Sequence, residues 1–297
     1  MKQLLPESYL RRWNLLELQK DKLQEIRLRC GQPLCLTYGG SERVLSNHLV
    51  GKLDLDRIFQ WLCEYGVYAY QEEMEKGYVT IQGGHRIGIG GQMIMDGAGK
   101  VMRIKHISSL LIRVSHDVVG VAEGVMEKLY VCGYLQNTLI LSPPGCGKTT
   151  LLRDMVRQVS NGTLWGAGLH VSLVDEREEL AAVYMGVPTM DVGKRTDIIS
   201  GCEKAVAMEM CLRALGPEVV AVDEVYSEKD MAALIRLQGC GCVILATHHA
   251  YSLEEFWEKP FGCDVRKEKL FKRFVRLEKQ EGRYHISGVF DENGELL

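Results

Sequence analysis

Apolar residues recur with three different spacings along the chain, and each spacing predicts a different kind of structure. Up to about residue 80 they follow a helical period, as at Leu53, Ile58 and Leu62, which predicts a mostly helical zone. Residues 25–29 alternate instead and predict one short strand within that zone. Residues 78–115 alternate in short runs broken by glycines, which predicts strands joined by tight hairpins.

From about residue 117 onward, strand and helix patterns alternate. The apolar runs that predict strands lie at residues 137–141, 170–174, 219–222 and 243–246. A helical stripe follows the first run, and a capping box at 227–230 opens another helix. This alternation predicts a mostly parallel sheet with helices on its faces, and residues 274–286 predict a terminal hairpin. We therefore expect a smaller α+β domain over residues 1–116 and an α/β domain over residues 117–297.

Composition and charge narrow the class of protein. Apolar residues make up 46% of the 297 positions and charged residues 25%, as in ordinary globular proteins. No apolar run approaches the ~18 residues of a membrane-spanning helix, and the N-terminal segment lacks the apolar core of a signal peptide, so a cytosolic protein is expected. The net charge of −3 argues against a protein that works mainly on nucleic acid. The ten cysteines include no CxxC pair, which favours buried thiols over zinc ligands or disulfides.

A glycine-rich segment between the first predicted strand and its helix has the pattern of a phosphate-binding loop. Its residues are Ser142, Pro143, Pro144, Gly145, Cys146, Gly147, Lys148, Thr149 and Thr150. Backbone N–H groups of such a loop and the positive end of the following helix bind phosphate oxygens. Lys148 is predicted to reach the β- and γ-phosphates, and the hydroxyl of Thr149 to help hold Mg²⁺. The predicted ligands are therefore ATP and Mg²⁺, although Ser142 stands where the usual first glycine would be.

Hydrolysis requires carboxylates as well as a phosphate loop, and two predicted strands end in them. Asp223 and Glu224 follow the strand at 219–222; Asp223 would hold the metal through water, and Glu224 would deprotonate the attacking water. Glu176, after the strand at 170–174, competes for the role of base. The strand at 243–246 leads into Thr247 and His249, either of which could sense the γ-phosphate at the carboxyl edge of a parallel sheet.

An arginine that stabilises the transferred phosphoryl group is the remaining part that phosphoryl transfer often uses. The sequence offers four candidates for this arginine, which are Arg86, Arg113, Arg195 and Arg213. Each of them is also compatible with an ordinary surface ion pair.

The order of these motifs resembles that of the type II and type IV secretion ATPases. The resemblance rests on segments 142–150, 175–177, 212–224 and 247–249. It implies a RecA-like P-loop NTPase domain with Glu176 in an acidic box and His249 in a histidine box. It also implies an N-terminal domain that packs over the nucleotide and lends arginines such as Arg86 and Arg113. Secretion ATPases usually carry glycine where this chain has Asp223. The resemblance therefore does not decide whether Glu224 or Glu176 is the main general base.

Segments 25–29, 84–91 and 107–113 resemble more specifically the stage III sporulation protein AA family of endospore-forming bacteria. That resemblance implies an ATPase of the mother cell that assembles as a ring, a hexamer on the family pattern. The ring would sit on the cytosolic face of the membrane around the forespore and energise a channel built by integral membrane proteins. Two alternatives remain open: a nucleic-acid-dependent ATPase of similar core, and a non-catalytic scaffold gated by nucleotide.

Overall fold

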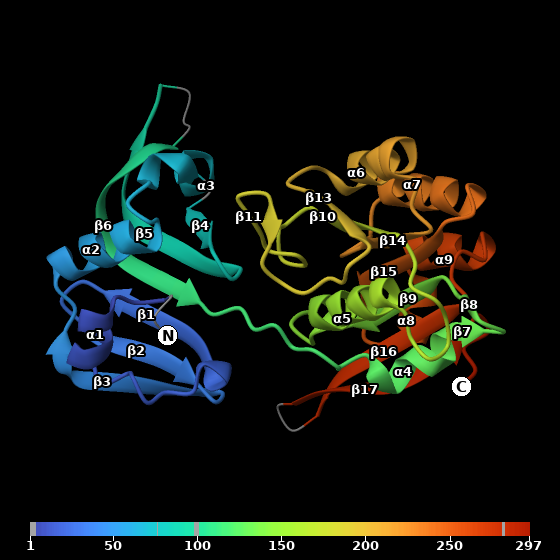
Figure 1. The fold of residues 1–297 in the computed structure, drawn as a ribbon, viewed down its shortest axis with the longest axis horizontal. Coiled ribbons are helices and arrows are strands. Elements are labelled where there is room, and N and C mark those ends of the chain that lie inside the picture. Colours follow the sequence, from blue (N-terminus) through green and yellow to red (C-terminus); the bar gives the residue numbers. More distant parts are fainter. Residues whose placement is uncertain (1–3, 76, 98–100, 281–282) are drawn as a thin grey trace. The chain divides into compact units, whose positions relative to one another are not determined.

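The computed structural model describes residues 4–75, 77–97, 101–280 and 283–297 and divides the chain into two compact units (Figure 1). The first unit is Met1–His116 together with Tyr184–Thr189, and the second is Asp117–Val183 together with Met190–Leu297. A small hairpin of β11 (Val183–Tyr184) and β12 (Val187–Pro188) therefore passes from the second unit into the first. The domains expected from the sequence were contiguous and did not include this exchange.

The first unit is built on a six-stranded sheet with the order β3-β2-β1-β6-β5-β4. Neighbouring strands in it run antiparallel. The strands are β1 (Leu23–Arg29), β2 (Pro33–Tyr38), β3 (Ser41–Leu49), β4 (Tyr78–Ile81), β5 (His85–Met95) and β6 (Val101–Arg113). The helices are α1 (Glu7–Arg12), α2 (Lys52–Leu62) and α3 (Gln71–Glu75), with 3₁₀ turns at Lys20–Lys22 and Val67–Tyr70.

The prediction of a mostly helical zone up to residue 80 was wrong, because two strands follow β1 directly. Pro33 is the first residue of β2, a strand position that tolerates proline, whereas a proline shortly after a glycine ordinarily indicates a turn. Helical spacing does predict α2, although Leu53 lies on its exposed side while Ile58 and Leu62 are buried. The predicted strand at 25–29 and the glycine-rich hairpin of β5 and β6 are confirmed, and residues 98–100 of that turn lie outside the described residues.

The second unit contains a seven-stranded sheet with the order β13-β10-β14-β15-β9-β16-β17. Its strands are parallel except for β17, which pairs antiparallel with β16. The strands are β9 (Thr138–Ser142), β10 (Val171–Asp175), β13 (Thr196–Ser200), β14 (Val219–Val222), β15 (Val243–His249), β16 (Arg273–Gln280) and β17 (Arg283–Asp291). The mostly parallel sheet, its four predicted strands and the terminal hairpin are confirmed, whereas β13 was not anticipated.

Helices cover both faces of this sheet. One hydrophobic core joins the sheet to α4 (Glu123–Leu129) and α5 (Lys148–Asn161). A second core joins it to α6 (Lys204–Met210), the π-helical turn η3 (Cys211–Leu215), α7 (Glu228–Gly239), α8 (Leu253–Glu258) and α9 (Pro260–Lys267). A short pair of strands, β7 (Tyr130–Val131) and β8 (Tyr134–Leu135), follows α4.

Burial on both faces explains why the strands of the second unit are uniformly apolar. Leu139 packs into the core on one side of β9 and Ile140 into the core on the other, because successive side chains of a strand point to opposite faces. All parallel strands of this sheet end at one edge, so the residues after β9, β10, β14 and β15 are brought together there.

The first unit contains a buried histidine whose protonation is linked to stability. His85 is 1% exposed, its Nδ1 accepts a hydrogen bond from the Ser115 amide at 3.0 Å, and its buried Nε2 has no partner among the described residues. Burial lowers the pKa of His85 from its ordinary value of 6.5 to about 4. The neutral imidazole is therefore the form that the fold accommodates.

We predict that this histidine makes the protein less stable in mild acid. Below pH 6.5 the unfolded chain binds a proton that the folded unit takes up only near pH 4, so the free energy of unfolding decreases as the pH falls through this window, by up to roughly 3 kcal/mol. Urea unfolding of the full chain between pH 4.5 and 7.5 measures the effect. The variant His85→Gln should show a flatter pH dependence, and an unchanged slope would contradict the assignment.

Candidate functional site

The loop between β9 and α5 exposes a run of unpaired backbone donors. Gly145 and Gly147 adopt φ values of 71° and 85°, a left-handed conformation that favours glycine. A Cβ at either position would meet no atom within 4 Å, so conformation and not space requires glycine there. The amide N–H groups of residues 145–150 donate to no acceptor among the described residues, as at the start of any helix. The loop can therefore donate hydrogen bonds to an anion.

Lys148 places a buried ammonium group beside these amides. The residue is 4% exposed, and its Nζ lies 2.8 Å from Nδ1 of His249 and 3.3 Å from the carbonyl oxygen of Pro143. Burial lowers the pKa of Lys148, while the nearby charges of Asp223 and Glu224 act in the opposite direction. Among the described residues, no carboxylate forms an ion pair with this ammonium. The site thus holds a desolvated cation whose direct contacts are carbonyl and hydroxyl oxygens and the imidazole of His249.

Ser142 replaces the glycine that usually opens such a loop, and its geometry explains why serine fits. The residue is fully buried at the end of β9 in ordinary strand conformation. Its hydroxyl donates to the carbonyl oxygen of Pro143 at 2.8 Å, and both its carbonyl and its hydroxyl oxygen lie 3.4 Å from Nζ of Lys148. The serine side chain therefore turns back onto the loop.

Thr149 and Asp223 form a second pair at the same edge of the sheet. The Thr149 hydroxyl donates to Oδ2 of Asp223 at 2.7 Å, and the Thr247 hydroxyl donates to Oδ1. The oxygen of Thr247 in turn accepts from the amide of Glu224 at 2.9 Å. Hydroxyl and carboxylate oxygens are the donors that Mg²⁺ prefers, usually alongside substrate phosphates and water. No cluster of three or more His, Cys, Asp or Glu side chains among the described residues could bind a metal without such help.

Glu224 connects to Lys148 through His249. The Glu224 backbone has a φ of 52°, which is uncommon for a residue with a side chain, and it aims the carboxylate along the sheet edge. Oε1 of Glu224 lies 3.0 Å from Nε2 of His249, and Oε2 lies 2.7 Å from the guanidinium of Arg177. Lys148, His249, Glu224 and Arg177 thus form one continuous chain of polar contacts that runs from the start of α5 over the ends of β15 and β14 to the turn after β10.

Glu176, the other predicted base, makes a different contact. Its Oε2 lies 2.8 Å from Nζ of Lys204, whose ammonium also sits over the Tyr226 ring at 4.8 Å. The preceding residue, Asp175, is 2% exposed and accepts hydrogen bonds from the amides of Glu179, Leu180 and Ala181. Asp175 thus shapes the turn, while Glu176 is neutralised by a lysine of α6.

The four arginines considered from the sequence make contacts within their own units. Arg86 lies over the Tyr78 ring at 3.6 Å, and Arg113 pairs with Glu25 at 3.5 Å, both within the first unit. In the second unit, Arg195 donates to the carbonyl oxygen of Ser160, and Arg213 pairs with Glu209.

Arg177 was not considered, although it contacts Glu224. The sequence feature that could have identified Arg177 is its position directly after Asp175 and Glu176, at the end of a predicted strand.

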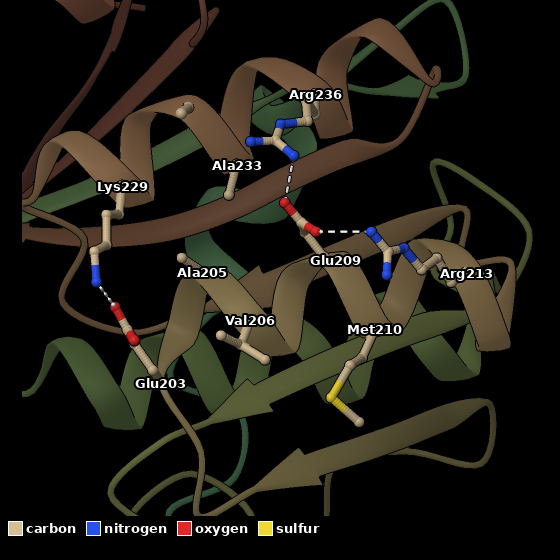
Figure 2. Close-up of a pocket in the computed structure, with 10 residues that line it drawn as sticks. Glu203, Ala205, Val206, Glu209, Met210, Arg213, Lys229, Ala233 and Arg236 are labelled. Carbon is tan, nitrogen blue, oxygen red and sulfur yellow. Dashed lines mark hydrogen bonds and ion pairs between the residues drawn. The ribbon is translucent and has the colours of Figure 1, made fainter.

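A groove of about 360 Å³ lies elsewhere on the second unit, between α6, η3 and α7 (Figure 2). Its charged side chains are paired with one another. Glu209 bonds to both Arg213 and Arg236, and Glu203 bonds to Lys229. Arg213, one of the four candidate arginines, lines this groove, whereas the phosphate loop, Asp223, Glu224, Glu176 and His249 do not.

Comparison with known proteins identifies relatives over the full chain. The model of the family described as "Sporulation stage III, protein AA" matches residues 1–297. Stage III sporulation protein AA of Bacillus subtilis (strain 168) is 34% identical over 301 residues, which cover 100% of this chain and 94% of that protein. An uncharacterized protein, ycf45, of Cyanidium caldarium is 24% identical over 55% of this chain and 47% of its own length.

Solved structures with the same fold include a pilus motor and an ATPase. The pilus retraction motor PilT, solved with bound ADP, superposes with a TM-score of 0.64 at 16% identity, over 96% of this chain and 82% of that one. The Legionella pneumophila ATPase DotB gives a TM-score of 0.61 at 12% identity, over 91% of this chain and 77% of that one. These similarities confirm the RecA-like P-loop NTPase fold predicted from the sequence.

No helix among the described residues combines the length and apolar character that crossing a membrane requires. The sequence motifs, the fold and the full-length matches agree on one relationship. The chain belongs to the sporulation stage III, protein AA family.

Proposed function

We propose that the protein is a Mg²⁺-dependent ATPase whose reaction takes place at the carboxyl edge of the second unit's sheet. The observation that carries this proposal is the buried ammonium of Lys148, which lacks a carboxylate partner among the described residues and lies beside a run of unpaired amides. A buried cation that no carboxylate contacts directly is costly and favours an anionic ligand. A triphosphate supplies that charge and accepts hydrogen bonds from the loop.

The binding residues follow from their positions. Amides of the loop from Pro144 onward and the N-terminus of α5 would hold the phosphates, and Lys148 would contact the β- and γ-phosphates. Mg²⁺, held by Thr149 directly and by Asp223 through water, would neutralise phosphate charge when it is bound. The direct hydrogen bond between the two side chains shows that they are close enough to share one site.

Glu224 is the proposed general base. Its carboxylate takes a proton from the attacking water as the water oxygen bonds to the γ-phosphorus, and the bond from that phosphorus to the β–γ bridging oxygen breaks. ADP and inorganic phosphate leave, and the proton on Glu224 returns to solvent. Lys148 stabilises the negative charge that develops on the leaving oxygen. Glu176 is disfavoured as base because its carboxylate pairs with Lys204 of α6, whereas Glu224 contacts His249 and through it Lys148.

His249 and Thr247 connect the phosphate region to the carboxylates. His249 contacts both Lys148 and Glu224. If an arriving phosphate moves the lysine, the contact of His249 with Glu224 would therefore change as well. Thr247 bonds Asp223 and the amide of Glu224, so it links the metal residue to the base. We propose that these contacts make β15 the sensor of the γ-phosphate.

The cellular role is proposed from the family. Membership in a sporulation family and the fold of secretion ATPases support a motor that energises a channel between mother cell and forespore. We propose that it assembles as a homo-oligomeric ring on the cytosolic face of the membrane around the forespore. Its partners would be integral membrane proteins of that channel, and Arg86 or Arg113 would act on nucleotide within the ring. The net charge gives no reason to expect nucleic acid as a partner.

The variant Lys148→Ala should lose at least about 10²-fold in ATP turnover, because the developing phosphate charge loses its buried cation. Phosphate release with saturating Mg²⁺ and ATP measures the effect, with circular dichroism to verify folding. Lys272, which pairs with Glu292 on the surface, provides a matched control, and Lys272→Ala should keep wild-type turnover. Normal hydrolysis by the Lys148 variant would refute the site.

The variant Asp223→Asn should raise the Mg²⁺ concentration needed for half-maximal turnover by about 10-fold or more. Asparagine keeps an acceptor for the Thr149 hydroxyl but removes the negative charge that a metal-bound water requires. A Mg²⁺ titration of ATP turnover measures it, with Asp197→Asn on β13 as an exposed control. An unchanged Mg²⁺ requirement would remove Asp223 from the metal site.

A further inference from the structure

The Glu224 carboxylate is held at both oxygens. Oε1 contacts Nε2 of His249 at 3.0 Å, and Oε2 contacts the guanidinium of Arg177 at 2.7 Å. A carboxylate that is held at one oxygen can still rotate about its terminal torsion, whereas one held at both cannot rotate without losing a contact. Arg177 therefore completes the orientation of a group that His249 alone would leave free to turn.

The turn that carries Arg177 is itself fixed from both sides. Asp175 accepts hydrogen bonds from three amides of this turn, at 2.8–3.0 Å. Arg153, on the helix that follows the phosphate loop, is buried and donates to the carbonyl oxygens of Leu180 at 2.6 Å and Glu179 at 2.7 Å. These hydrogen bonds connect the turn that holds Arg177 to α5, the helix that begins with Lys148.

The neighbouring acidic residue does not compete for this guanidinium. Glu176 is adjacent to Arg177 in sequence and carries an acidic side chain. The Lys204 ammonium, 7% exposed, occupies the Glu176 carboxylate at 2.8 Å. Arg177 is left to pair with Glu224, so the lysine of α6 indirectly determines the partner of the arginine.

We propose that Arg177 is a positioning residue that fixes the Glu224 carboxylate for deprotonation of the attacking water. This inference rests on the proposed ATPase function and adds to it a residue that acts through the base and not on the phosphate. The Arg177 side chain is 58% exposed. Exposed ion pairs contribute little to folding stability, so the pair serves orientation and its removal leaves the fold intact.

The decisive experiment is a double-mutant cycle on single-turnover ATP hydrolysis with saturating Mg²⁺. It compares the wild type, Arg177→Ala, Glu224→Gln and the double variant. Arg177→Ala should lower the rate about 10–10²-fold, as expected for a misplaced catalytic group, with the KM for ATP changed less than about threefold. In the Glu224→Gln background the same change should alter the rate by less than about twofold, because the base that it positions is already lost.

Two further variants sharpen the result. Arg177→Lys should recover part of the rate, because an ammonium can still contact one carboxylate oxygen but lacks the planar geometry of a guanidinium. Arg236→Ala removes an arginine of α7 that has a similar exposure and pairs with Glu209 of α6, and it should leave turnover unchanged. Binding of a fluorescent ATP analogue to Arg177→Ala should remain within about threefold of the wild type.

Each other outcome overturns the inference. An equal loss in the wild-type and Glu224→Gln backgrounds would mean that Arg177 acts on the phosphoryl group itself. A raised KM with an unchanged rate would make it a binding residue, and no effect would make it a surface ion pair. Absence of turnover in the wild type would instead overturn the proposed function, and the inference would fall with it.

Discussion

A buried ammonium group without an acidic partner is the constraint on which the candidate site depends. Lys148 is held by carbonyl oxygens and by the imidazole of His249, so among the described residues its charge has no direct counterion. A desolvated cation of this kind is costly unless an anion joins it. The unpaired amides that precede it on the loop point to the same kind of ligand. We therefore propose a polyphosphate as the anion that pairs with this ammonium.

The order of the strands brings Lys148 and the acidic residues together at one edge of the sheet. Strand β15 lies between β9, which ends in the phosphate loop, and β14, which ends in Asp223 and Glu224. His249 at the end of β15 therefore stands between the lysine and the base, and it contacts both. The sequence predicts that these strands are parallel and end at one edge, because their apolar runs alternate with helical stripes. It does not predict their order, which depends on how each crossover packs against the sheet.

The sequence predicts a candidate site where its motif is local, and leaves the choice open where a distant residue decides. The loop at 142–150 was identified because strand, glycines, lysine and helix are adjacent in the chain. The choice between Glu224 and Glu176 stayed open because Lys204, which pairs with Glu176, lies in α6, and three strands separate that helix from β10. Arg177 was missed because its partner lies 47 residues away, since 224 − 177 = 47. The strands after β1 were missed because Pro33 begins a strand where it indicates a turn.

The most direct test of the account compares two conservative variants in one assay. Glu224→Gln and Glu176→Gln each remove one carboxylate charge and keep the shape of the side chain, so their single-turnover rates of ATP hydrolysis separate the two acidic residues. The account predicts that Glu224→Gln still binds ATP but hydrolyses it about 10²-fold or more slowly, while Glu176→Gln changes the rate far less. A full loss of hydrolysis in Glu176→Gln with near-normal turnover in Glu224→Gln would contradict it.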